Sequence, residues 1–254
     1  MHRFLLGIAA AAMLASSASA QTADEIVTKY IKAVGGMEKI QAVTTLRRTG
    51  KIIAGGGFEI ALVRLNKRPG MTRDEITLQG MVAVVAYNGK AGFKIMPFQG
   101  KKDPEPLGEE ELKAVLEEAD FDGPLVNYQQ KGNKIEFVGM EAVDGTDAFK
   151  LKVTLANGEV RLYYMDTDYY VPIKIVTKRI IRGAEIETET LLGDYKEVNG
   201  WYLPFSIESG PIGSQDKEKV ALDKIEANVP IEDSRFDQPP AGSRPGTGAG
   251  PAHQ

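Results

Sequence analysis

The stretch Phe149-Lys150-Leu151-Lys152-Val153-Thr154-Leu155 alternates apolar and polar side chains, and it leads through Asn157-Gly158 into a second run from Val160 to Met165. A period of two places the apolar side chains on one face of a β-strand. Asn-Gly is favoured in two-residue hairpin turns, where both turn positions need a positive φ angle. The stretch therefore predicts an antiparallel β-hairpin with one buried face.

Similar patterns lie on both sides of this hairpin, with further tight turns expected at Asn88-Gly89 and Asn199-Gly200. The chain lacks the regularly spaced helices that would connect parallel strands. The expected strands are 58–63, 72–79, 81–87, 91–96, 149–155, 160–165, 173–181, 184–192, 195–197, 201–209 and 217–228. The sequence thus predicts a mostly β (α+β) fold with about ten antiparallel strands in one curled sheet.

Helices are expected at three places beside this sheet. Ala23 to Val34 carries apolar residues at helical spacing and stops at Gly35-Gly36, and Met37 to Ala42 continues it. Gly108 to Asp120 places Leu112, Val115 and Leu116 on one helical face between glutamates. We expect these helices to cover the inner face of the sheet.

The two ends of the chain predict processing and disorder. Residues 1–20 combine Arg3, a short apolar run and Ala18-Ser19-Ala20, which is typical of a cleaved signal peptide. Residues 238–254 are rich in proline and glycine and offer almost no apolar surface for packing. We therefore expect a single domain over 21–237 that is exported to the periplasm, followed by a disordered tail over 238–254.

The composition argues against several classes of function. The net charge of −4 and the scattered lysines and arginines disfavour nucleic acid as a partner. The chain has no cysteine, and its two histidines are His2 in the expected signal peptide and His253 in the tail. A folded domain without these residues lacks the usual zinc ligands and the usual general base of triad hydrolases. We expect no metal and no cofactor.

Carboxylate chemistry is the enzymatic alternative that this composition leaves open. A glycosidase needs two acids, and Asp120, Asp122, Asp166 and Asp168 are the candidates. Both pairs lie at the end of an expected helix or strand, where aspartate is common in turns. We interpret them as turn residues.

The order and spacing of several short segments resemble those of a known family. They are Val138 to Gly145, Phe149 to Leu151, Tyr164-Met165-Asp166, Pro172-Ile173-Lys174 and Asp194 to Pro204, with Arg68-Pro69-Gly70 and Arg73 in the first half. With these features the chain resembles the periplasmic lipoprotein-sorting family, whose members carry lipidated proteins or lipids to the outer membrane. The resemblance implies a half-open antiparallel barrel wrapped around helices, an apolar cavity for acyl chains and no catalytic residues. It also implies that an early-strand arginine contacts a helical lid, and Arg73 is the matching position.

The expected cavity wall combines strand and helix residues. Phe58, Ile60 and Leu62 alternate along one strand, and Val82 and Val84 lie on a nearby strand. The helix face with Leu112, Val115 and Leu116 completes the predicted apolar wall.

Two functions follow from this sequence. The first is a monomeric periplasmic carrier of lipid or of lipoprotein acyl chains, which exchanges cargo with an envelope transporter or an outer-membrane acceptor. The alternative is a non-enzymatic sensor or adaptor that docks an envelope protein through the same fold.

Overall fold

The structure is a computed structural model that describes residues 21–181, 184–240 and 242. The expected signal peptide, residues 1–20, lies outside the described residues, and so does the tail from residue 243 onward. The cleavage, the domain limits and the disordered tail therefore stay predictions.

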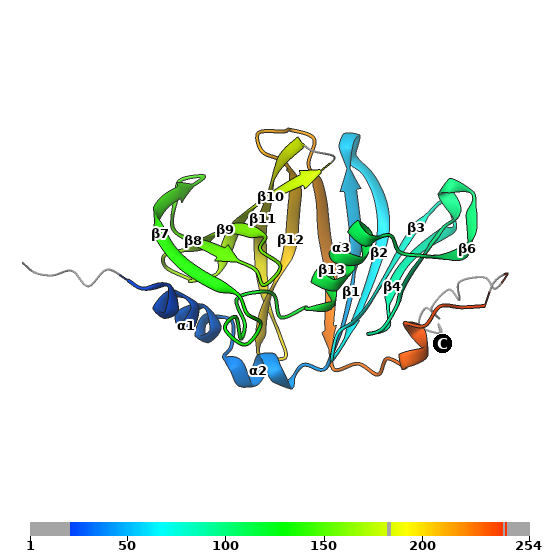
Figure 1. The fold of residues 1–254 in the computed structure, drawn as a ribbon, viewed down its shortest axis with the longest axis horizontal. Coiled ribbons are helices and arrows are strands. Elements are labelled where there is room, and N and C mark those ends of the chain that lie inside the picture. Colours follow the sequence, from blue (N-terminus) through cyan, green and yellow to red (C-terminus); the bar gives the residue numbers. More distant parts are fainter. Residues whose placement is uncertain (1–20, 182–183, 241, 243–254) are drawn as a thin grey trace, which may run out of the picture.

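A single antiparallel sheet dominates the fold (Figure 1). Its strands are β1 (Thr45–Ala54), β2 (Phe58–Lys67), β3 (Met71–Leu78), β4 (Met81–Tyr87), β5 (Gly92–Met96), β6 (Lys101–Pro106), β7 (Lys134–Val143), β8 (Thr146–Thr154), β9 (Val160–Asp166), β10 (Pro172–Ile181), β11 (Ala184–Val198), β12 (Trp201–Pro211) and β13 (Glu218–Ala227). Among the described residues these thirteen strands pair in the order β6-β5-β4-β3-β2-β1-β13-β12-β11-β10-β9-β8-β7. The first and last strands therefore meet in the middle of the sheet, and β6 and β7 form its two edges.

The predicted fold class is confirmed, and the structure adds strands that the alternation did not reveal. The expected list had no strand at 45–54, 101–106 or 134–143, and it divided β11 into two pieces. β6 reads Lys-Lys-Asp-Pro-Glu-Pro, which is tolerated because an edge strand pairs on one side only. β11 continues through Asp194, whose positive φ angle of 53° interrupts the alternation without ending the strand.

The predicted helices are present as α1 (Ala23–Ala33), α2 (Met37–Ala42) and α3 (Glu109–Ala119). A capping box begins α1, because Glu25 N donates to Thr22 Oγ1 (3.2 Å) and Thr22 N donates to Glu25 Oε2 (2.9 Å). After α1, Gly35 has a φ of 118°, and a Cβ there would lie 1.9 Å from the Gly200 carbonyl oxygen. Glycine is thus required where α1 meets the β11–β12 turn.

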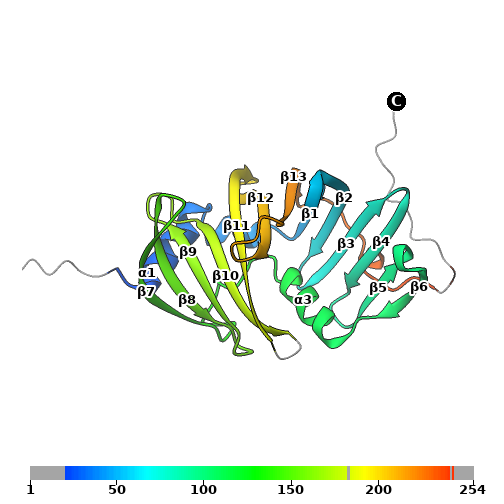
Figure 2. The ribbon, with the colours of Figure 1, turned by 90° about the horizontal axis from the view of Figure 1, so that it is seen from above.

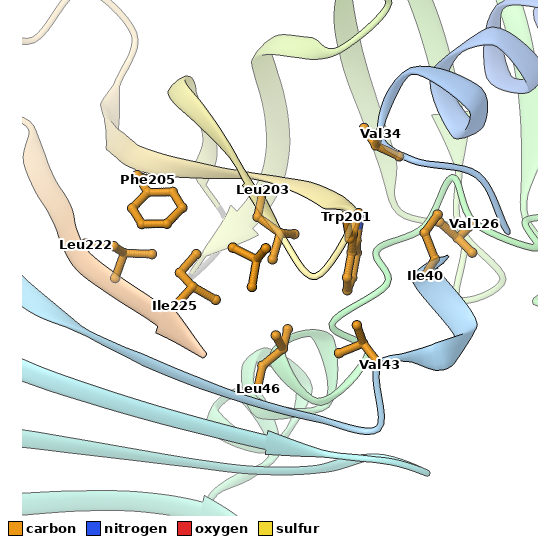
Figure 3. Close-up of a cluster of buried hydrophobic side chains, with 11 residues drawn as sticks. Val34, Ile40, Val43, Leu46, Val126, Trp201, Leu203, Phe205, Leu222 and Ile225 are labelled. Atoms are coloured by element: carbon orange, nitrogen blue, oxygen red, sulfur yellow. The ribbon is translucent and has the colours of Figure 1, made fainter. Parts of the chain in front are cut away.

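All three helices lie on the same face of the sheet, which we call the helix face; the opposite one is the outer face. Around Trp201, α2 and the end of α1 pack on β1, β12 and β13, as shown in Figure 3; the buried residues are Val34, Ile40, Val43, Leu46, Val126, Val198, Trp201, Leu203, Phe205, Leu222 and Ile225. A second cluster joins Ile26 and Val27 of α1 to Leu151 and Tyr163 of the predicted hairpin. Seen from above, the sheet bends into two halves, with α3 between them (Figure 2).

Candidate functional site

Helix α3 joins the two halves of the sheet through adjacent glutamates. Glu117 pairs with Arg161 of β9 at 2.6 Å, and Glu118 pairs with Arg64 of β2. The backbone is held as well, because Asn66 Nδ2 donates to the Glu118 carbonyl oxygen at 2.8 Å. The helix therefore lies across the helix face, attached by polar contacts to strands that are far apart in the sheet order.

A cavity of about 830 Å³ lies beside α3, between the two halves. One wall comes from the β2–β3 connection and the other from the β8–β9 connection. Its apolar lining includes Met71, Leu116, Phe121, Pro124 and Leu155. This volume falls in the range of small-molecule sites, which are ~300–1,000 Å³.

The charged groups around this cavity are paired with one another. Arg68 binds Asp122 through two hydrogen bonds of 2.7 and 2.6 Å, and Lys131 binds Asp120 at 2.7 and 2.6 Å. The Nε of Arg161 is the one fully buried side-chain nitrogen or oxygen without a hydrogen-bond partner in the part of the chain that the structure describes. The cavity thus combines an apolar lining with a rim of closed ion pairs.

Two buried tyrosines place hydroxyl groups in the interior without adding charge. Burial raises the pKa of Tyr163 to about 12, and burial also raises the pKa of Tyr30 well above its ordinary value. Both phenols stay protonated at neutral pH. They can donate hydrogen bonds, but neither is placed to act as a base.

Toward the β1–β2 turn, away from the cavity, the helix face carries an apolar strip formed by Ile52, Ile60, Ile207 and Val220. The strand register brings them together, because Ile52 pairs with both Ile60 and Val220, and Val220 pairs with Ile207. All are partly exposed. In Figure 1 the upper parts of β1, β2 and β13 extend above α3. The strip is therefore an apolar surface that the helices leave open.

Comparison with known proteins identifies this architecture. No protein-family model matches the sequence, and no curated protein matches it significantly. Among solved structures, a LolA superfamily protein from Nitrosomonas europaea superposes with a TM-score of 0.58 at 14% identity, over 86% of this chain and 98% of that chain. The chain has the fold of the LolA superfamily. A domain from Vibrio parahaemolyticus, described as an outer membrane lipoprotein-sorting protein, gives a TM-score of 0.50 at 13% identity, over 84% and 95% of the two chains. The predicted resemblance is confirmed at the level of the LolA fold.

Within this LolA-like fold, six of the predicted wall residues belong to the helix face or to α3. Phe58, Ile60 and Leu62 share the helix face of β2. Leu112, Val115 and Leu116 lie on α3, and only Leu116 of the whole predicted set lines the 830 Å³ cavity. Leu62 and Val115 are buried in packing contacts, whereas Phe58 is 49% exposed at the end of its strand.

The prediction that Val82 and Val84 line the same surface is wrong. Val82 pairs with Thr77 and Val84 pairs with Glu75, which places both valines on the outer face. Val84 is fully buried there with Phe93 and Ile95. The register of the β3–β4 hairpin decides this, because a shift of one residue moves a side chain to the other face of a strand.

The predicted lid contact of Arg73 is also wrong, because this arginine lies on the outer face. Its Nε donates to Glu75 Oε1 at 2.7 Å and its Nη1 donates to the Arg235 carbonyl oxygen at 3.1 Å. In the LolA-like fold of this chain, the arginine that reaches α3 is Arg64. Its position could have been found from the alternation Ile60, Leu62, Arg64, which keeps it on the same face as the apolar residues.

Three of the four aspartates considered for catalysis, Asp120, Asp122 and Asp166, have structural partners for their carboxylates. Asp120 and Asp122 form the ion pairs described above, and Asp166 Oδ1 accepts hydrogen bonds from the backbone N–H groups of Asp168 and Tyr169, both at 2.8 Å. This supports their interpretation as turn residues. Across residues 21–181, 184–240 and 242, no group of three or more histidine, cysteine or acidic side chains is placed to hold a metal ion, and no helix is long and apolar enough to span a membrane.

Proposed function

We propose that the protein is a non-enzymatic periplasmic carrier that binds the acyl chain of a lipid or a lipoprotein and transports it toward the outer membrane. The observation that carries the proposal is the open apolar strip on the helix face, which lies toward the β1–β2 turn, at the end of β2 away from the α3 cavity. A contiguous, partly exposed apolar surface is typical of a binding site.

The hydrophobic effect is large enough for such a function. Burying about 14 methylene groups at ~0.8 kcal/mol each gives roughly 11 kcal/mol of gross driving force, before the entropic cost of immobilising the chain. Micromolar affinity needs about 8 kcal/mol. An acyl chain on this face can therefore bind without specific polar contacts.

Two adjacent isoleucines provide a matched test of the proposed surface. Ile52 lies on the helix face and Ile53 on the outer face of β1, and both are partly exposed. We expect Ile52→Ser to weaken the displacement of a fluorescent fatty-acid probe by roughly tenfold, because about 1.4 kcal/mol of apolar contact is lost. Ile53→Ser should leave probe binding unchanged, and the urea midpoints of both variants should stay similar.

Native mass spectrometry of the exported protein, purified from its own membrane-containing lysate, tests the cargo directly. A bound mass that corresponds to a lipid supports the carrier. If no lipid is retained and Ile52→Ser binds the probe like the unmodified protein, the carrier proposal fails. The sensor or adaptor hypothesis, with an envelope protein as partner, would then be the next to test.

A further inference from the structure

Arg48 differs from Arg64 and Arg161 on the same face because no carboxylate binds it. It lies in β1 directly opposite Arg64 of β2, on the face that carries α3. Its Nη1 donates to Asn66 Oδ1, and among the described residues Arg48 forms no ion pair. Since a guanidinium has five N–H donors, most of the hydrogen-bonding capacity of Arg48 is unused.

The nearby carboxylates are already engaged by Arg64. Its Nε and Nη2 bind the two oxygens of Asp74 at 2.7 and 2.6 Å, and its Nη1 binds Glu118. Like charges directly opposite on neighbouring strands destabilise each other. Burial lowers the pKa of the Arg48 guanidinium to about 10, and the charge of Arg64 acts in the same direction. The charges of Glu118 and Asp74 act in the opposite direction, so Arg48 is still cationic at neutral pH. Neither carboxylate forms an ion pair with it.

Toward the end of β1 the surroundings of Arg48 become apolar and lead to the strip. The next positions of β1 on this face are Gly50 and Ile52, and the residues paired with Gly50 are the buried Leu62 and Leu222. From Arg48 to the end of β1 at Ala54 the strand covers about 20 Å, at ~3.3 Å per residue. One leaflet of a bilayer is about 15 Å of hydrocarbon. The distance therefore fits one acyl chain.

We propose that the ligand of the helix face is an amphiphile with an anionic head group, which pairs with Arg48 while its acyl chain lies along the apolar strip. This inference rests on the proposed carrier function and narrows its cargo. An anion removed from water needs a charged partner, and Arg48 offers a cation with N–H donors that no carboxylate binds. An uncharged lipid would form no ion pair with the guanidinium. A carboxylate and a phosphate monoester both provide the required pair of oxygens.

Matched ligands with a twelve-carbon chain test the inference by calorimetry on the mature protein. Dodecanoate and dodecyl phosphate should bind about 10 to 150 times more tightly than dodecanol, the effect of a hydrogen bond to a charged group. Acetate and inorganic phosphate, which lack the chain, should not bind measurably. The relative affinity of dodecanoate and dodecyl phosphate tells which head group the site prefers.

Adjacent arginines again supply the control. Arg48→Gln should bind dodecanol as before and lose the preference for the anions, whereas Arg48→Lys should keep part of it. Arg47→Gln removes the same charge from an exposed side chain on the outer face and should keep the full preference. The urea midpoint of Arg47→Gln should be unchanged, and that of Arg48→Gln should fall only slightly, because Arg48 loses a hydrogen bond to Asn66 but no ion pair.

The failures of the two proposals are distinguishable. If dodecanol and the anions bind the unmodified protein equally, the carrier stands and the anionic head group is refuted. If Arg48→Gln keeps the preference, another cation is responsible and the role of Arg48 is refuted. If no twelve-carbon ligand binds, the carrier proposal itself fails. If acetate or inorganic phosphate binds as tightly as the amphiphiles, the acyl chain contributes nothing. The site is then a simple anion site and not a lipid site.

Discussion

The two faces of the β2–β4 region are covered by different kinds of contact. On the outer face, residues 229–237 pack through Ile231 and Phe236 onto Leu65, and Phe236 is fully buried. On the helix face, α3 buries only the small side chains of Val115 and Ala119 and is attached by the ion pairs of Glu117 and Glu118, while its Leu116 remains 43% exposed. Buried apolar contacts resist opening, whereas solvent-accessible ion pairs add little stability. We therefore infer that residues 229–237, which we call the outer cover, are part of the core. Helix α3 is the cover of the opposite face and is the one that can be displaced.

The largest effect is expected at the outer cover. Phe236→Ala should lower the free energy of unfolding by about 3–5 kcal/mol, because a fully buried aromatic side chain is removed and a cavity remains. Urea denaturation measures the loss. Leu116→Ala in α3 is the matched control and should cost less than about 1 kcal/mol. Equal losses in the two variants would contradict the distinction between the covers.

An intermediate effect is expected where α3 is attached. Arg64→Gln breaks the ion pairs with Asp74 and Glu118, which are 20% and 48% exposed, so the cost should be about 1–2 kcal/mol, between surface and buried pairs. Hydrogen exchange of the α3 amides should become faster, while exchange in residues 229–237 should not change. Faster exchange at both covers would mean that they open together.

The smallest effect is a pH dependence confined to α3. The hydrogen bond from Lys94, supported by the backbone N–H of Gly108, lowers the pKa of Glu111 below its ordinary 4.5. A lowered folded-state pKa stabilises the fold fully above pH 4.5 and progressively less as the pH falls through the lowered value. The unfolding midpoints of the unmodified protein and Glu111→Gln should therefore differ slightly at pH 6 and converge on acidification. A difference that persists in acid would argue against this origin.

The comparison of the faces also shows where sequence reasoning succeeded and where it failed. The hairpin around Asn157-Gly158 was predicted within a few residues, because alternation and turn type are local. The resemblance predicts that Arg73 contacts the lid, yet it lies under the outer cover. The face on which a side chain lies depends on the hairpin register, and its contacts depend on a C-terminal segment far away in sequence. The alternation of β2 places Arg64 on the helix face, but it does not show that Arg64 contacts α3.

The antiparallel class and the three helices follow from periodicity and turn residues, which are properties of short segments that can be read before the chain is folded. The lack of histidine and cysteine in the expected domain follows from composition alone. Only the tertiary structure decided that β1 meets β13, that Val82 and Val84 face away from Ile60, and that Arg48 is left without a carboxylate. These features depend on pairing between strands distant in the chain, where a shift of one residue exchanges the two faces of the sheet.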